Sequence, residues 1–362
     1  MYIEKLSLTG FRNLKDINLK LNNGINIFFG ENAQGKTNIL ESMYICSTGR
    51  SHRTRSDSQL INFIKQESHI QLYAVKEKRK DRIDVHIKRD EKKGIAINGI
   101  AIKKSGELFG TLYTVIFSPE DLNLIKEGPS ERRRFMDIEI CQINNIYYYD
   151  LQQYYKVLKQ RNNLLKKIQI NPSLKETLFV WDKQLLEYGE KIINSREKFI
   201  KKLSKIAAKE HKKISGDKEI LEINYKPSCN LPDLAQKMNN YLERDIIYGS
   251  TQIGPHKDDI SFLINGNDVK IYGSQGQQRT TALSCKLAEI ELIKNETGHT
   301  PVLLLDDVLS ELDKQRQKYL LDNIDKIQVI ITCTGIEDSI NKYKNKSFIF
   351  SIKDGDIYKQ NN

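Results

Sequence analysis

The stretch FFGENAQGKTN, from Phe28 to Asn38, decides the fold of this chain. It fits the pattern G-x-x-x-x-G-K-[ST] from Gly30 to Thr37, and it follows the short apolar run INIFF. A helical pattern begins at Lys36. A buried strand, a glycine-containing loop and a helix in this order are typical of a phosphate-binding loop. The sequence therefore predicts a site for ATP or GTP, since the motif and its context agree.

The chemistry of phosphate binding explains the residue type at each fixed position of the motif. Gly30 and Gly35 permit tight turns, so that successive backbone N–H groups surround phosphate oxygens. Lys36 brings a positive charge to the β- and γ-phosphates, and Thr37 offers a hydroxyl to Mg²⁺. The positive end of the helix dipole adds to this anion site. The predicted nucleotide-binding residues of the loop are Gly30, Glu31, Asn32, Ala33, Gln34, Gly35, Lys36, Thr37 and Asn38.

A second motif, LLLDDVLSELD, runs from Leu303 to Asp313. Its leucines predict a buried strand that ends at Asp306, where a carboxylate reaches Mg²⁺ through the water shell of the ion. Asp307 follows and is placed to accept a proton from the attacking water. We therefore predict Thr37 and Asp306 as metal-site residues, and Asp307 with Lys36 as catalytic residues. Asp313 is expected to cap the next helix.

A third motif is the polar turn SQGQ, Ser274 to Gln277, in front of a long helical pattern. A hydroxyl and a flexible glycine at a helix N-terminus form an anion site. By its place before the acidic strand, the turn resembles the signature motif of ABC-type ATPases, which binds the γ-phosphate of nucleotide held by another subunit. The resemblance implies nucleotide contacts for Ser274, Gly276 and Gln277, although Gln275 stands where a first glycine is common.

The order of patterns along the chain predicts an α/β fold. Alternating and apolar strand patterns fill the first 117 residues, helical patterns dominate from 118 to 249, and helix–strand alternation returns afterwards. We expect an ABC-type P-loop ATPase head that is split by a helical, short coiled-coil-like insertion. The expected parts are residues 1–117 (head, with the phosphate loop), 118–249 (helical arm or lid) and 250–362 (head, with the signature turn and acidic strand). The two long arm helices are expected at 148–169 and 174–213.

Composition narrows the class of protein. The chain has 362 residues, is 39% hydrophobic and carries a net charge of +11. Residues 151–215 hold 16 Lys and Arg against 6 Asp and Glu, a surplus of 10, which favours a polyanion such as DNA as partner, with a solvated helix face as the alternative. The five cysteines are scattered, without CxxC, which argues against a disulfide framework and structural zinc. No apolar run approaches a membrane span, and no signal-peptide core stands at the start, so we expect a cytoplasmic protein without a membrane partner.

The whole chain resembles the RecF family of SMC-like DNA repair ATPases. The resemblance is carried by the three motifs above and by four others: FRNL (11–14), GRSHRT (49–54), EGPSERRRFMD (127–137) and GPHKDD (254–259). EGPSERRRFMD and GPHKDD are the most specific to the family. The length agrees as well, because other SMC-like proteins insert hundreds of residues of coiled coil.

The resemblance implies a role in DNA replication, recombinational repair and the response to DNA damage. It implies ATP and Mg²⁺ as cofactors and an ATP-dependent head-to-tail homodimer on DNA, at gaps or single-strand/duplex junctions. RecR and RecO are the implied partners in helping RecA to load. Asp307 replaces the usual glutamate, and Thr332 or Thr334 stands at the switch-histidine place. Both departures from transporter ATPases indicate slow hydrolysis, suited to a timed clamp rather than a motor. The expected enzyme is a weak, DNA-stimulated ATPase that hydrolyses ATP as a switch.

Other readings of the motifs remain open at this point. One is an ATP-gated DNA clamp whose hydrolysis is incidental, and another is a transport ATPase subunit, which would need a membrane partner. A small-molecule kinase would leave SQGQ without a role. Arg12 is expected to reach phosphate or adenine, with a surface arginine as the alternative.

Residues of the two most specific motifs also have open roles. Some of Arg132, Arg133 and Arg134 are expected to contact DNA or a partner head. His256 and Lys257 are either structural or part of the nucleotide or interface region. Of the consecutive tyrosines at 147–149, core packing of one or two is expected.

Overall fold

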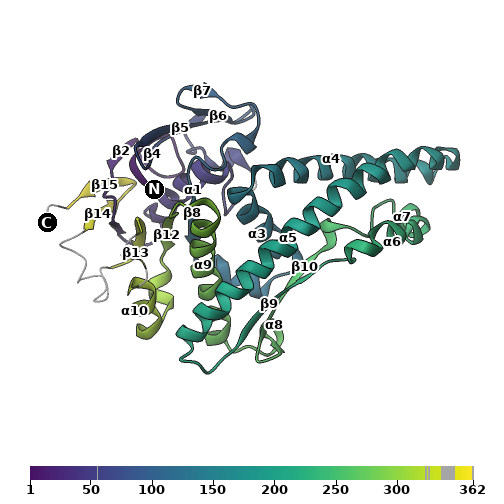
Figure 1. The fold of residues 1–362 in the computed structure, drawn as a ribbon. Coiled ribbons are helices and arrows are strands. Elements are labelled where there is room, and N and C mark those ends of the chain that lie inside the picture. The colour runs from purple at the N-terminus through teal and green to yellow at the C-terminus, as the bar shows by residue number, and fades with distance from the viewer. Residues whose placement is uncertain (55, 323, 325–326, 336–346, 361–362) are drawn as a thin grey trace. The chain divides into compact units, whose positions relative to one another are not determined.

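The computed structural model describes residues 1–54, 56–322, 324, 327–335 and 347–360 (Figure 1). The chain forms two compact units. The first unit contains residues 1–122 and 282–362, and the second contains residues 123–281. The α/β class with a helical insertion is therefore confirmed.

The division into parts differs from the expected one at the C-terminal end of the insertion, where the boundary falls at residue 281 and not at residue 249. The reason is a strand pairing: β9 (Leu221–Lys226) is antiparallel to β10 (Asp259–Ile264), so a boundary at 249 would cut a sheet. The signature turn at Ser274 consequently belongs to the second unit.

The first unit contains an antiparallel sheet with the strand order β2-β1-β4-β5-β6-β7. Its strands are β1 (Tyr2–Thr9), β2 (Ile17–Lys20), β4 (Glu67–Lys76), β5 (Arg79–Lys88), β6 (Gly94–Ile97) and β7 (Ile100–Ala101). Asn98 and Gly99 both have positive φ between β6 and β7, as a two-residue hairpin turn requires.

The second sheet of this unit carries the phosphate loop. Its order is β15-β14-β3-β13-β12-β8, and its strands run parallel except for β15. The strands are β3 (Ile25–Phe29), β8 (Thr114–Phe117), β12 (Val302–Asp306), β13 (Val329–Cys333), β14 (Ser347–Lys353) and β15 (Asp356–Lys359). β12 and β13 are buried along their whole length, which explains why they read as unbroken apolar runs in the sequence.

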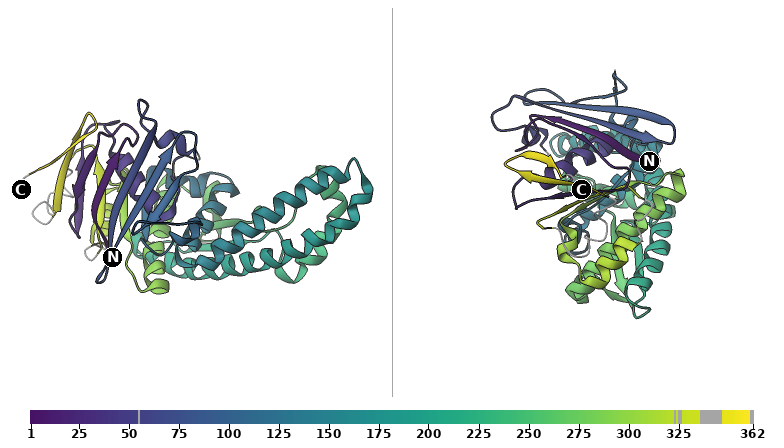
Figure 2. Two further views of the ribbon diagram at one scale, coloured as in Figure 1. Left: turned by 90° about the horizontal axis from the view of Figure 1, so that it is seen from above. Right: turned by 90° about the vertical axis from the view of Figure 1, so that its left-hand side faces the viewer.

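Helix α1 (Lys36–Thr48) contacts strands of both sheets and forms the layer between them (Figure 2). It is buried on nearly every side, and for that reason its sequence shows no amphipathic stripe. The other helices in the described part of this unit are α10 (Lys314–Asp322) and most of α9 (Gln275–Thr297), with 3₁₀ turns η1 (Asp57–Leu60), η2 (Ser105–Glu107), η3 (Pro119–Leu122) and η7 (Val308–Glu311).

The second unit is built on two long helices, α4 (Asn145–Ile168) and α5 (Leu178–Ile214), which lie side by side in Figures 1 and 2. They confirm the two predicted arm helices. The short 3₁₀ segment η4 (Pro172–Thr177) joins them, and Leu165, Ile168 and Leu178 form a small core there. The remaining elements are α2 (Asn123–Lys126), α3 (Pro129–Ile143), η5 (Leu231–Asp233), α6 (Leu234–Asn240), α7 (Leu242–Tyr248), η6 (Pro255–Lys257), β11 (Asn267–Asp268) and α8 (Val269–Tyr272). Among the described residues, no helix has the length and apolar character that a membrane crossing requires.

Candidate nucleotide-binding site

The loop between β3 and α1 needs its two glycines for close packing. Gly35 has φ +108°, and a Cβ atom there would lie 2.6 Å from Leu14 Cδ2. A Cβ atom on Gly30 would lie 2.5 Å from the carbonyl oxygen of Ile352 in β14. A larger side chain at either position would therefore displace the loop from its neighbours.

Lys36 is folded back over this loop. Its ammonium donates hydrogen bonds to the carbonyl oxygens of Gly30 at 2.5 Å and Glu31 at 2.8 Å, and the residue is buried. The charge is thus held against the loop backbone, at the place where the motif brings it to phosphate.

Thr37 and Asp306 come together across the unit although 269 positions separate them. The Thr37 hydroxyl donates to Asp306 Oδ1 at 2.9 Å, and the Thr332 hydroxyl of β13 donates to the same oxygen at 2.8 Å. Burial raises the pKa of the Asp306 carboxyl group, and the hydrogen bonds from Thr332 and Thr37 act in the opposite direction.

The donor set at this point fits Mg²⁺. A hydroxyl and a carboxylate supply two hard oxygen atoms, and phosphates and waters supply the others in such sites. No group of three or more His, Cys, Asp and Glu suited to a metal occurs in the described parts of the chain. An all-protein metal cage is thus not what the described residues offer, whereas a nucleotide-linked ion would need only Thr37 and Asp306.

Asp307 has an unusual backbone conformation, with φ +54°. Its N–H is shared between the carbonyl oxygen of Thr332 at 3.2 Å and the Thr332 hydroxyl at 3.1 Å. Aspartate tolerates this left-handed conformation better than most residues. Thr332, one of the two residues expected at the switch place, therefore contacts both acidic residues, whereas Thr334 is exposed.

Asn13 supports the phosphate loop, a role that we did not predict. Its amide donates to the carbonyl oxygen of Ala33 at 2.8 Å, and its Oδ1 accepts from the Asn38 amide at 2.6 Å. Gln34 is fixed from another side, because its Oε1 accepts from the Asp354 N–H at 2.6 Å. The FRNL motif pointed to the segment that contains Asn13, but nothing in the motif predicted a contact between Asn13 and the phosphate loop.

Arg12 is engaged by a buried carboxylate. Its guanidinium makes a bidentate pair with Glu41 of α1, at 2.9 and 2.8 Å. The Ser51 hydroxyl also donates to Glu41, at 2.5 Å, and Arg53 lies 3.9 Å from it. In this structure Arg12 thus links the segment after β1 to α1. Its expected contact with phosphate or adenine stays a prediction.

The signature turn lies in the second unit and forms a capping box at the start of α9. The Ser274 hydroxyl accepts from the Gln277 N–H at 3.2 Å, and Gln277 Oε1 accepts from the Ser274 N–H at 2.9 Å. Reciprocal bonds of this kind satisfy two helix-end donors. Ser274 is exposed, and Gly276 follows in the first helical turn.

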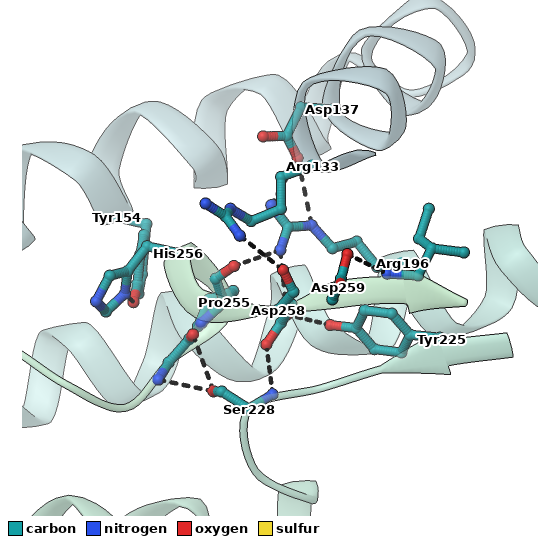
Figure 3. Close-up of polar contacts among 12 residues, drawn as sticks. Arg133, Asp137, Tyr154, Arg196, Tyr225, Ser228, Pro255, His256, Asp258 and Asp259 are labelled. Atoms are coloured by element: carbon teal, nitrogen blue, oxygen red, sulfur yellow. Dashed lines mark hydrogen bonds and ion pairs between the residues drawn. The ribbon is translucent and has the colours of Figure 1, made fainter. Parts of the chain in front are cut away.

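The motifs EGPSERRRFMD and GPHKDD bind each other inside the second unit. Arg132 makes a bidentate pair with Asp259, at 2.5 and 3.0 Å. Arg133 donates to the carbonyl oxygen of Asp258 at 2.8 Å (Figure 3). Arg132 is buried and has this structural contact, whereas Arg134 is half-exposed.

Arg196 of α5 lies at the centre of the same network (Figure 3). It donates to Asp137 at 2.8 Å, to Asp258 at 3.1 Å and to the carbonyl oxygen of Pro255 at 2.6 Å. Arg196 and Asp258 are both fully buried. Loss of one partner from such a pair leaves a buried charge and costs about 3–5 kcal/mol of stability. Asp137 and Asp258 are the structural residues that sequence reasoning missed here.

His256 is held in one tautomer. Its Nε2 lies 2.9 Å from the carbonyl oxygen of Thr251 and must donate, so its Nδ1 accepts from the Tyr154 hydroxyl at 2.7 Å. Burial lowers the pKa of His256 to about 4, and the nearby charges of Lys257, Arg133 and Arg196 act in the same direction. Lys257 itself is exposed.

Tyr147, the first of the three consecutive tyrosines, is buried and donates to Asp137 at 2.5 Å. Core packing is thus confirmed for this residue. Tyr149 is 48% exposed.

The comparisons with known proteins identify the family of the chain. The sequence model of the RecF/RecN/SMC N-terminal domain matches residues 2–355. The DNA replication and repair protein RecF of Lachnospira eligens is 52% identical over all of both chains, and that of Acetivibrio thermocellus is 46% identical over 99% of this chain and all of the relative.

Solved structures show the same similarity. The recombination mediator protein RecF with ATP, solved in the context of the RecFOR pathway, superposes with a TM-score of 0.93 at 39% identity over 99% and 98% of the two chains. An Smc head bound to the C-winged helix domain of ScpA superposes with a TM-score of 0.59 at 17% identity, over 99% and 98%, and supports the fold alone. The fold and the phosphate loop define the class: an SMC-like head of the ABC-type ATPases. Within that class, the chain belongs to the RecF family of DNA replication and repair proteins.

Proposed function

We propose that this protein binds DNA in an ATP-dependent manner during recombinational repair and replication restart. ATP drives head-to-tail dimerisation at gapped DNA or at single-strand/duplex junctions, and slow hydrolysis acts as a timer. With RecO and RecR, the dimer helps RecA to load. It acts in the cytoplasm.

The observation that carries the proposal is the meeting of Lys36, Thr37 and Asp306 at one sheet edge. The ammonium of Lys36 lies over the loop, and Thr37 and Asp306 share a 2.9 Å hydrogen bond. This arrangement supports a triphosphate in the loop, with residues 30–38 around it and Mg²⁺ at Thr37 and Asp306. Magnesium would supply charge neutralisation at the β- and γ-phosphates.

The dimer follows from the chemistry of the signature turn. Ser274, Gly276 and Gln277 form an anion site at a helix start, and we assign it to the γ-phosphate held by a second copy of the chain. The similar RecF protein was solved with ATP. A nucleotide that contacts two chains couples ATP binding to association.

The timer depends on Asp307, which is proposed to activate the attacking water. An aspartate is one methylene shorter than the usual glutamate, so its carboxylate reaches less far towards the γ-phosphate. The same feature favours the second candidate, a DNA clamp gated by ATP binding with incidental hydrolysis. The two differ in whether DNA raises ATP turnover, and we expect that it does, weakly.

The test mixes two inactive variants. Ser274→Arg should bind ATP as a monomer, because residues 30–37 are untouched, yet its side chain should block ATP-dependent dimerisation. Lys36→Ala should bind ATP about 10- to 100-fold more weakly, so its own loop stays largely empty at an ATP concentration that saturates the wild type. In a mixed dimer, the intact loop of one chain meets the intact turn of the other, so turnover and dimer mass should partly recover. If Ser274→Arg alone abolishes ATP binding by the monomer, the turn belongs to the pocket of its own chain and the head-to-tail proposal fails.

A further inference from the structure

The side chain of Gln277 is bound on two sides within the second unit. Its Oε1 closes the capping box with the Ser274 N–H, and its Nε2 donates to Glu219 Oε1 at 2.9 Å. Glu219 lies in the segment between α5 and β9, far from Gln277 in the sequence. The amide that closes the signature turn is therefore oriented by a carboxylate from another segment.

Glu219 is itself fixed by two neighbours. Its second carboxylate oxygen, Oε2, lies 2.9 Å from Nε2 of His211, which is fully buried in the last turn of α5. The N–H of the adjacent Ile220 donates to the side-chain Oδ1 of Asn265 at 2.9 Å, and the carbonyl oxygen of Ile220 accepts from the Asn265 N–H at 3.0 Å. A half-buried carboxylate with both oxygens engaged has little freedom to turn.

We propose that Glu219, held by His211, is a positioning residue for the signature turn. It fixes the amide of Gln277, Gln277 closes the box on Ser274, and the Ser274 hydroxyl is thereby presented in one orientation. The inference rests on the proposed function of Ser274 towards the nucleotide of a second chain. Glu219 acts through Gln277 and contacts no nucleotide itself.

The sequence of the capping box makes the contact testable. Glutamate serves as well as glutamine at the third helical position of a box. Gln277→Glu should therefore keep the capping box, and it would leave dimerisation unchanged if the box alone oriented Ser274. With Glu219 in place, however, the substitution sets two carboxylates about 3 Å apart, which repel each other.

The experiment measures ATP-dependent dimerisation, with and without DNA, for four variants. Glu219→Ala and Gln277→Glu should each weaken dimerisation about tenfold, since a hydrogen bond to a charged group is lost or replaced by repulsion. The double variant Glu219→Gln with Gln277→Glu should recover most of the loss, because the amide introduced at position 219 can accept from His211 and donate to the carboxylate introduced at position 277. Asp217→Asn, which removes an exposed charge from the same loop and keeps a residue type that tolerates the positive φ of this position, should behave as wild type.

The readouts separate positioning from folding and from the parent proposal. All four variants should bind ATP as monomers with wild-type affinity and stay folded at the assay temperature, although Glu219→Ala and Gln277→Glu should melt below the wild type because a hydrogen bond is lost or replaced by repulsion. Rescue by the exchanged pair supports the inference, and dimerisation of Gln277→Glu equal to wild type overturns it. If wild-type protein forms no ATP-dependent dimer, or if Ser274→Arg does not impair it, the proposed function fails instead.

Discussion

At the scale of single residues, Lys36 has the most direct expected effect. Lys36→Ala removes the charge that we propose faces the β- and γ-phosphates, and it also releases the carbonyl oxygens of Gly30 and Glu31. We expect ATP affinity to fall on the order of 10- to 100-fold, the range for a lost charge-assisted hydrogen bond. Titration with ATP measures this loss. Lys78→Ala, at an exposed lysine of the same unit, is the control, and equal affinities for the two variants would contradict the assignment of the loop.

Asp307 is expected to affect turnover and not binding. Asp307→Asn keeps the shape and the backbone N–H contact with Thr332, but an amide is a far poorer proton acceptor. ATP hydrolysis should fall about 100-fold or more, and the ATP-bound dimer should live longer. Asp313→Asn is the matched control from the same acidic stretch. Asp313 caps α10 by accepting from the Arg316 N–H, a role that asparagine fills equally well. Unchanged turnover in Asp307→Asn would move the catalytic carboxylate elsewhere.

His256 should make stability depend on pH. The pKa of an unfolded histidine is about 6.5, and in the fold it is lowered to about 4. The unfolded chain thus binds the proton first as pH falls, so this contribution is complete above about pH 6.5 and is lost towards pH 4. Between pH 7 and pH 5 the loss should be about 2 kcal/mol of unfolding free energy.

Urea unfolding at the two pH values measures the effect of His256. His256→Gln retains a donor for the Thr251 carbonyl oxygen but does not titrate, so its stability should fall less between pH 7 and pH 5 than that of the wild type. His86→Gln, at an exposed imidazole on β5, is the control. If His256→Gln loses as much stability on acidification as the wild type, the burial of a neutral imidazole does not govern this range.

At the scale of elements, the lysines of α5 test where DNA binds. Lys201, Lys202 and Lys205 are all exposed on this helix. Changing the three to glutamine should lower the slope of log affinity against log salt by up to about 2.7 for duplex DNA, which is about 0.9 per phosphate contact.

The matched control changes three exposed lysines of the other unit, Lys78, Lys92 and Lys103, to glutamine. It makes the same change in net charge. An unaltered slope in the α5 variant, with a reduced slope in the control, would place the DNA contacts on the head. Wild-type binding that does not respond to salt would contradict an electrostatic interface.

Elements with local signals could be predicted from the sequence. The fixed glycines of the motif predict the phosphate loop, and the turn residues Asn98 and Gly99 predict the hairpin. Contacts between distant segments could not be predicted, because single side chains make them. Glu219 is one carboxylate in a lysine-rich segment, and only the fold brings it to Gln277. The contacts of Glu41, Asn13 and Asp258 could not be predicted for the same reason.

At the scale of the whole molecule, strand order was the least predictable feature. Alternation of helices and strands indicated a parallel sheet, but nothing local specified that β3 lies between β13 and β14. Gln328 is a similar case. Its side-chain amide accepts from the Ile3 N–H at 2.6 Å and donates to the Ile3 carbonyl oxygen at 2.7 Å. It thus makes the two hydrogen bonds to β1 that the backbone of a neighbouring strand would otherwise make. No sequence pattern around Ile3 or Gln328 predicts this contact.

The place of β3 in its sheet has a consequence for the order in which the protein matures. Both neighbours of β3 come from the C-terminal end of the chain, Val329–Cys333 on one side and Ser347–Lys353 on the other. During synthesis, the strand that precedes the phosphate loop therefore waits without partners until residues 329–353 have been made. The second unit is contiguous, residues 123–281, and acquires all its own strands and helices earlier. A nascent chain thus completes its helical arm while the sheet under the phosphate loop is still unformed, so we expect nucleotide to be captured only after residues 329–353 have been translated.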